Sequence, residues 1–142
     1  MNILFFLKPK ASVVTIYDSS TLRQTLEVME HYRYSAIPVL KKTGEYVGTI
    51  SEGDILWYIK NKGNFNIYDA EKIGISDIKR YRDNLPIRID EDMSNLINIS
   101  TKENFIPVID DRNMFIGIIT RQDIINYFYK QQVHYEKQAN IN

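Results

Sequence analysis

The sequence predicts an α+β fold made of two β-α-β-β-α repeats that are related by a pseudo-two-fold axis, with their sheets packed together. The first observation is an internal repeat. Segments 35–59 and 104–128 align without a gap at a constant offset of 69 residues, the separation between Pro38 and Pro107. The second is that each segment holds two apolar runs separated by a turn residue. The third is an amphipathic helical stretch before each segment.

The hairpin in each repeat is indicated by one informative substitution. Gly44 in the first copy is matched by Asn113 in the second. Both residue types tolerate a positive φ, and each lies between two apolar runs. This pattern is typical of a β-hairpin whose turn needs a left-handed residue.

The remaining elements follow from apolar spacing. Leu22, Leu26 and Met29 share one helical face, and Thr21 with Gln24 predicts a capping box at the start of that helix. In the second copy the corresponding apolar residues predict a shorter helix; they are Met93, Leu96 and Ile97. Short strands are predicted before each helix, over 12–16 and 85–89, and apolar helices after each hairpin, over 54–60 and 123–130.

These elements divide the chain into four parts. The first repeat is predicted over 7–60 and the second over 75–130, which opens with a short helix at 75–81. Each repeat has only about 50 residues, too few to bury a stable core alone, so the two must share one. Residues 61–74 are predicted to be a polar linker. Residues 131–142 are predicted to be a polar tail that frays.

Composition excludes several classes of function. Among the 142 residues, 18 Lys and Arg balance 18 Asp and Glu, so no net field favours nucleic acid. The absence of cysteine removes disulfides, thiolate nucleophiles and Cys-based metal sites, and fits a cytoplasmic protein. The apolar run at the start is too short for a signal peptide, and no later stretch is apolar enough to cross a membrane. His31 and His134 have no partners that would indicate metal ligation.

Two matching heptapeptides, "GTISEGD" (48–54) and "GIITRQD" (117–123), are the candidate site motifs. Ser51 and Thr120 each precede an apolar helix and have an aspartate three residues later, Asp54 and Asp123. One interpretation is a helix cap that needs no ligand. The other is a ligand site, because a helix N-terminus suits a phosphate and a carboxylate can accept two hydrogen bonds from a ribose. The residues alone favour the cap but leave both interpretations open.

With "AIPVL…VGTISEGDIL" and "FIPVI…IGIITRQDII" in register, the chain resembles a tandem pair of cystathionine-β-synthase (CBS) domains. The resemblance covers roughly 7–130, and no enzymatic domain lies beside it. It implies a regulatory module, not an enzyme, that binds adenosine nucleotides (AMP, ADP or ATP) in clefts between the repeats. It implies no other cofactor, a homodimer and an unknown effector protein, with no nucleic acid or membrane partner. A cyclic di-AMP receptor and a ligand-free interaction module are the alternatives.

The resemblance also implies which residues form each cleft, with Thr on the phosphate and Asp on the ribose. For the Thr120 and Asp123 cleft these are Ser12, Val14, Tyr34, Phe105 and Ile118, with Arg121, Lys8 and Lys10 as cations for a phosphate. For the Ser51 and Asp54 cleft they are Ala36, Thr49, Leu85, Ile87 and Asn104, with Lys79, Arg80, Arg82 and Arg88 nearby.

Two features distinguish the predicted clefts. Glu52 takes the place of Arg121 in the first motif and would repel a phosphate, so the Thr120 cleft is preferred. Phe105 either stacks on a base or plugs its cleft. Ordinary core packing remains open for Val14, Ile87 and Ile118. Aromatic residues after the hairpins are expected in the core or at a dimer interface; they are Trp57, Tyr58 and Tyr127.

Overall fold

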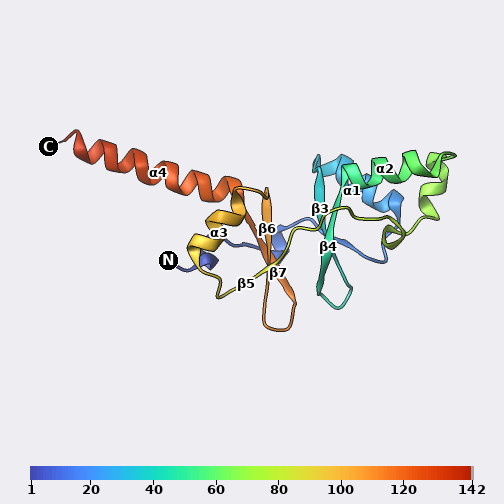
Figure 1. Cartoon of the computed structure of the whole chain (residues 1–142), viewed down its shortest axis with the longest axis horizontal. Coiled ribbons are helices and arrows are strands. Elements are labelled where there is room, and N and C mark those ends of the chain that lie inside the picture. Colours follow the sequence, from blue (N-terminus) through green and yellow to red (C-terminus); the bar gives the residue numbers. More distant parts are fainter. Residues whose placement is uncertain (142) are drawn as a thin grey trace.

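The computed structural model describes residues 1–141 and contains the predicted β-α-β-β-α order twice. The first repeat comprises β2 (Ile16–Tyr17), α1 (Leu22–Tyr32), β3 (Ala36–Leu40), β4 (Tyr46–Ser51) and α2 (Glu52–Lys62). The second comprises β5 (Ile87–Arg88), α3 (Met93–Ser100), β6 (Phe105–Ile109), β7 (Phe115–Thr120) and α4 (Arg121–Ala139). The two sheets meet in the middle of the molecule, with α1 and α2 outside one and α3 and α4 outside the other (Figure 1).

The two hairpins have the same register. In the first, Val39 pairs with Gly48, and in the second Val108 pairs with Gly117. Both have an irregularity after this pair, and the turn residues Gly44 and Asn113 both adopt the expected positive φ. The sequence offset therefore predicted a true structural repeat.

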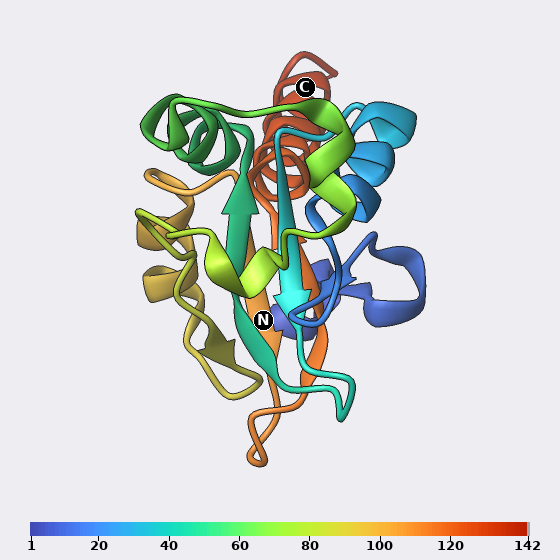
Figure 2. The same ribbon diagram turned by 90° about the vertical axis from the view of Figure 1, so that its right-hand side faces the viewer.

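The pseudo-two-fold axis passes between the hairpin turns, where equivalent residues meet. Glu45 forms a bridge with Met114, and the backbone N–H of Phe115 donates to the carbonyl of Gly44 at 3.0 Å. The rings of Tyr46 and Phe115 stack with their centroids 6.3 Å apart. Viewed at right angles, the first hairpin lies in front of the second (Figure 2).

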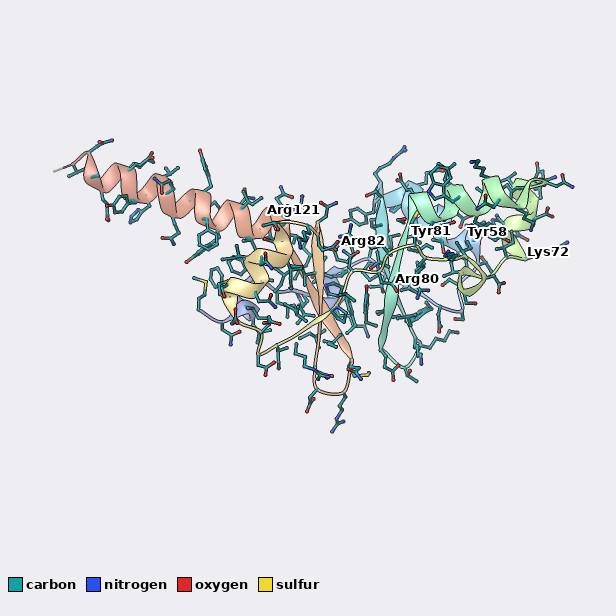
Figure 3. The ribbon with its side chains drawn as sticks, in the orientation of Figure 1. Tyr58, Lys72, Arg80, Tyr81, Arg82 and Arg121 are labelled. Atoms are coloured by element: carbon teal, nitrogen blue, oxygen red, sulfur yellow. The ribbon has the colours of Figure 1, made fainter. Side chains whose placement is uncertain are left out.

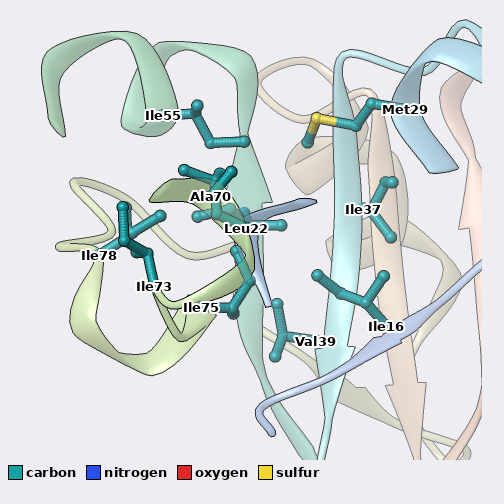
Figure 4. Close-up of a cluster of buried hydrophobic side chains, with 11 residues drawn as sticks. Ile16, Leu22, Met29, Ile37, Val39, Ile55, Ala70, Ile73, Ile75 and Ile78 are labelled. Atoms are coloured by element: carbon teal, nitrogen blue, oxygen red, sulfur yellow. The ribbon is translucent and has the colours of Figure 1, made fainter. Parts of the chain in front are cut away.

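Each repeat has its own apolar cluster between sheet and helices, so the prediction of one shared core was wrong. The first includes Leu22, Ile37 and Ile50 and is drawn in Figure 4. The segment predicted as a polar linker contributes to it through Ala70 and Ile73. Backbone bonds hold this segment in place, with Leu22 N–H donating to the Ile73 carbonyl at 2.8 Å. Residues 61–74 are therefore partly a structural element of the first repeat.

The N-terminal residues pack on the second repeat instead of the first. The short strand β1 (Lys8–Pro9) pairs antiparallel with β7 and completes the four-stranded sheet β1-β7-β6-β5. Ile3 and Phe6 are buried in the second cluster. The other sheet has the order β2-β3-β4.

Three predicted features were wrong in extent or type. The strands expected at 12–16 and 85–89 are reduced to Ile16–Tyr17 and Ile87–Arg88, since residues 10–12 form a 3-10 turn. The chain after Lys130 continues α4 to Ala139 instead of fraying, because its Gln, Lys, Glu and Ala residues are good helix formers. The helix expected at 75–81 is a 3-10 turn at Ile75–Asp77.

Replacing Gly117 by alanine should be strongly destabilising. Gly117 has a φ of +154°, and an added Cβ would lie 2.1 Å from the carbonyl oxygen of Lys8 on the paired β1 strand. We expect Gly117→Ala to lower the free energy of unfolding by about 2–3 kcal/mol, measured by urea denaturation. Gly53→Ala is the control, since its Cβ would meet no atom closer than 3.7 Å. Equal stability of the two variants would contradict this account.

Candidate functional site

A cleft of about 870 Å³ lies between the repeats, at the end of the sheets where α4 begins. It contains most of the residues predicted for the second motif: Ser12, Val14, Tyr34, Phe105, Ile118, Thr120 and Arg121. Lys8 also lines it. Lys10 is not among the lining residues. Phe105 forms part of the wall and leaves the cleft open.

Two residues predicted for the other cleft belong to this one. Ala36 and Asn104 both line the cleft that contains Thr120. Asn104 lies there because its carbonyl accepts a hydrogen bond from Arg121 N–H at 2.8 Å, which holds it beside the start of α4. Ala36 lies there because the start of β3, together with Tyr34, forms the first-repeat wall of the cleft. The sequence predicts both residues in the cleft of Ser51 and Asp54, and this prediction was wrong.

At the second motif the aspartate side chain is exposed. Thr120 Oγ1 accepts a hydrogen bond from Asp123 N–H at 3.1 Å, so the hydroxyl caps α4. Within residues 1–141, the Asp123 carboxylate accepts no hydrogen bond, and it is not part of the cleft wall itself. Its neighbours Arg121 and Gln122 line the cleft.

The first motif is instead a complete structural cap. Ser51 Oγ accepts from Asp54 N–H at 3.1 Å, and Asp54 Oδ2 accepts from Ser51 N–H at 3.0 Å. The second oxygen of Asp54 accepts from Tyr81 N–H at 3.1 Å. Asp54 is only 4% exposed. Both carboxylate oxygens are therefore used by backbone groups, and this geometry favours the cap over ligand binding at Ser51 and Asp54.

Residues 80–84 occupy the space that would be the first cleft. The Asp83 carboxylate accepts from Thr49 N–H at 3.0 Å and from Arg80 Nε at 2.8 Å. It lies so close to Gly48 that an added Cβ there would be 2.4 Å from Asp83 Oδ1. Thr49 is consequently buried at 2% exposure.

A half-buried tyrosine, Tyr46, packs against the same region. The Tyr46 hydroxyl donates to the carbonyl of Asn84 at 2.7 Å and lies 2.7 Å from Thr49 Oγ1. Burial raises the pKa of Tyr46, so its phenol stays neutral across the physiological range. The other residues predicted for this cleft lie elsewhere: Ile87 is in the second apolar cluster, and Leu85 is 77% exposed.

The open cleft is rich in cations. Lys8, Arg82, Lys102 and Arg121 line it, with Glu103 as its acidic residue. Arg121 is held by its Nε, which donates to the carbonyls of Ser100 at 2.7 Å and Glu103 at 3.2 Å. In Figure 3, Arg82 lies between Arg121 of the second repeat and Arg80 and Tyr81 on the side of the first.

Sequence reasoning missed part of this wall. Arg82 was predicted near the first cleft, and Asn84, Lys102, Glu103 and Gln122 were not singled out. The one signal that could have found Lys102 and Glu103 is their position next to Asn104, directly before β6. Within residues 1–141, no cluster of His, Asp and Glu has the arrangement of a metal site. In the same residues, no helix combines the length and apolarity needed to span a bilayer.

The family model for the CBS domain matches the chain twice, over residues 7–61 and 75–130. The chain belongs to the CBS domain family. Each match covers one structural repeat and includes its hairpin and the helix that follows it.

Two curated relatives are much longer than this chain. An inosine-5′-monophosphate dehydrogenase of Methanocaldococcus jannaschii is 26% identical over 113 residues, which are 80% of this chain and 21% of that protein. A homoserine O-acetyltransferase of Methanohalophilus mahii is 29% identical over 114 residues, 79% of this chain and 22% of that protein. The CBS chain thus spans about a fifth of the length of these two relatives.

Solved structures match over nearly the whole chain. CbpB in complex with c-di-AMP has a TM-score of 0.86 at 25% identity and covers 97% of this chain and 91% of its own. CbpB from Streptococcus agalactiae has a TM-score of 0.81 at 26% identity, with coverages of 95% and 84%. CBSX2 in complex with AMP shares the fold, with a TM-score of 0.72 at 20% identity and coverages of 92% and 98%.

The two motif aspartates should differ in their effect on stability. Asp54→Ala removes both acceptors of the buried cap and leaves the N–H groups of Ser51 and Tyr81 unpaired, so we expect a loss of about 2–4 kcal/mol. Asp123→Ala removes an exposed side chain, so we expect about 0.5 kcal/mol or less. Urea denaturation of both variants tests this difference. If Asp123→Ala costs as much as Asp54→Ala, the second motif is also a structural cap.

Proposed function

We propose that this CBS pair is a regulatory sensor that binds one adenine nucleotide per chain in the cleft beside Thr120. The observation that carries the proposal is the difference between the two motifs. The Asp54 carboxylate of the first motif is occupied by the N–H groups of Ser51 and Tyr81, whereas Thr120 and Arg121 of the second motif line an open cleft and the Asp123 carboxylate is exposed.

The cleft offers the groups that each part of a nucleotide needs. The Thr120 hydroxyl and the four cationic side chains that line the cleft suit a phosphate. The carboxylate of Asp123 can accept from both ribose hydroxyls. Phe105, Val14 and Ile118 provide apolar surface for the base. The volume lies within the range of about 300–1,000 Å³ that is usual for small-molecule sites.

Cyclic di-AMP is a second candidate ligand. The observation that favours it is the likeness to CbpB in complex with c-di-AMP, at 25% identity over 97% of this chain. The same cleft would then hold one adenosine phosphate half of the ligand. Isothermal titration with each ligand distinguishes cyclic di-AMP from AMP, ADP and ATP.

The output of the sensor is a change in how the chain contacts other chains. We propose a homodimer formed through α2 and α4, which expose apolar side chains, namely Leu56, Trp57, Ile125, Phe128 and Tyr129. A ligand shifts such an assembly only by its different affinity for two shapes of it, and an effector protein would read the difference. Catalysis is not part of the proposal.

Isothermal titration with AMP, ADP, ATP and cyclic di-AMP tests the proposal. We expect at least one of them to bind at about one adenosine moiety per chain, because the other cleft is filled. Asp123→Ala should weaken that binding at least about tenfold through loss of the ribose contact.

Asp111→Ala is the matched control, since Asp111 is an exposed carboxylate in the hairpin turn of the same repeat. It should bind as the wild type does. No heat with any of the four ligands would leave the interaction module as the better interpretation. Two sites per chain would contradict the assignment of the first motif as a structural cap.

A further inference from the structure

An ion pair lies in the wall of the open cleft that also contains Thr120. Arg82 donates from its guanidinium to the carboxylate of Glu103, and both side chains line the cleft. The pair is unequal in exposure, with the Arg82 side chain 66% exposed and that of Glu103 19% exposed. Because the arginine is largely in solvent, the pair adds little to stability and can be exchanged for another anion.

The backbone that carries Arg82 is held firmly on both sides. Tyr81 N–H donates to Asp54, and Asp83 bonds to Thr49 and Arg80, so both neighbours are anchored in the first repeat. Asn84 donates from its side-chain amide to the carbonyl of Phe105 at 2.9 Å. Arg82 lines the cleft and can therefore change its side-chain partner without a change in the position of its Cα.

Glu103 is attached to the two arginines of the cleft in different ways. Its carbonyl oxygen accepts from Arg121 Nε at 3.2 Å, and its carboxylate pairs with Arg82. The carboxylate places a negative charge among Lys8, Lys102, Arg82 and Arg121, which otherwise form a cationic site. A phosphate in the cleft would be repelled by Glu103 and attracted by Arg82.

We infer that Glu103 is a built-in competitor for the phosphate, and that Arg82 is the phosphate-binding residue that it holds until a ligand arrives. Ligand binding exchanges the carboxylate of Glu103 for a phosphate oxygen on the guanidinium of Arg82. Glu103 thereby sets the affinity threshold and discriminates between ligands by their phosphate charge. The inference deepens the proposed function and rests on it.

Titration of adenosine, AMP and ATP into wild type and Glu103→Gln tests the exchange. Glutamine keeps the size of the side chain and the backbone contact to Arg121 but removes the competing charge. We expect Glu103→Gln to bind AMP and ATP about three- to tenfold more tightly, with more gain for ATP, and to leave the affinity for adenosine unchanged. Arg82→Gln should weaken AMP and ATP by about tenfold and likewise spare adenosine. In the double variant that combines Glu103→Gln with Arg82→Gln, the gain in affinity from Glu103→Gln should disappear, because the arginine that it releases is absent.

Glu27→Gln is the matched control. Glu27 also pairs with an arginine, Arg23, but this pair lies on α1 outside the cleft. Glu27→Gln therefore removes the same charge without changing the site. It should change none of the three affinities. An equal change for adenosine and ATP, or weaker ATP binding in Glu103→Gln, overturns the inference while the proposed function stands. Failure of the wild type to bind AMP, ATP or cyclic di-AMP overturns both.

Discussion

The structure depends on the carboxylate of Asp54, which joins the two halves of the chain. One oxygen closes the cap of α2, and the other fixes Tyr81 at the entrance to the second repeat. At 4% exposure the charge is sheltered, and the two backbone donors provide the hydrogen bonds that a buried carboxylate requires. This contact places the 80–84 segment against β4, and the segment then fills the first cleft and lines the second.

The two motifs are therefore similar in sequence but differ in their hydrogen bonds. The same hydroxyl and aspartate at the same spacing form a closed capping box in one repeat and leave a free carboxylate in the other. The difference arises outside the motifs, because Asp83 packs on Gly48 whereas the equivalent Gly117 is covered by the backbone of β1. A duplicated motif thus keeps its hydroxyl cap in both copies, while its carboxylate is hydrogen-bonded in one copy and exposed in the other.

The sequence predicted what is local. The repeat, the positive φ at Gly44 and Asn113 and the capping box of Thr21 with Gln24 all depend on residues close in the chain, and the structure has them. The assignment of residues to clefts failed at Ala36 and Asn104 because it depends on how one repeat faces the other. The contact of Asp83 with Thr49 spans 34 residues and has no periodic or motif signal. Long-range hydrogen bonds of this kind are decided by tertiary packing.

The position of the open cleft relative to the pseudo-two-fold contact bears on signalling. The repeats are joined at the hairpin turns by the Glu45–Met114 bridge, whereas the cleft lies at the opposite end of the hairpins, where β7 ends and α4 begins (Figure 1). Its walls come from both repeats, with Tyr34 and Ala36 on one side and Thr120 and Arg121 on the other. In the sensor that we propose, a ligand there contacts two surfaces that no sheet pairing joins, and its binding energy acts on the start of α4. Because α4 extends well beyond the sheet, a small rotation at its first turn becomes a larger displacement at Ala139. In the proposed sensor, this lever links a nucleotide in the cleft to a distant surface that another chain can contact.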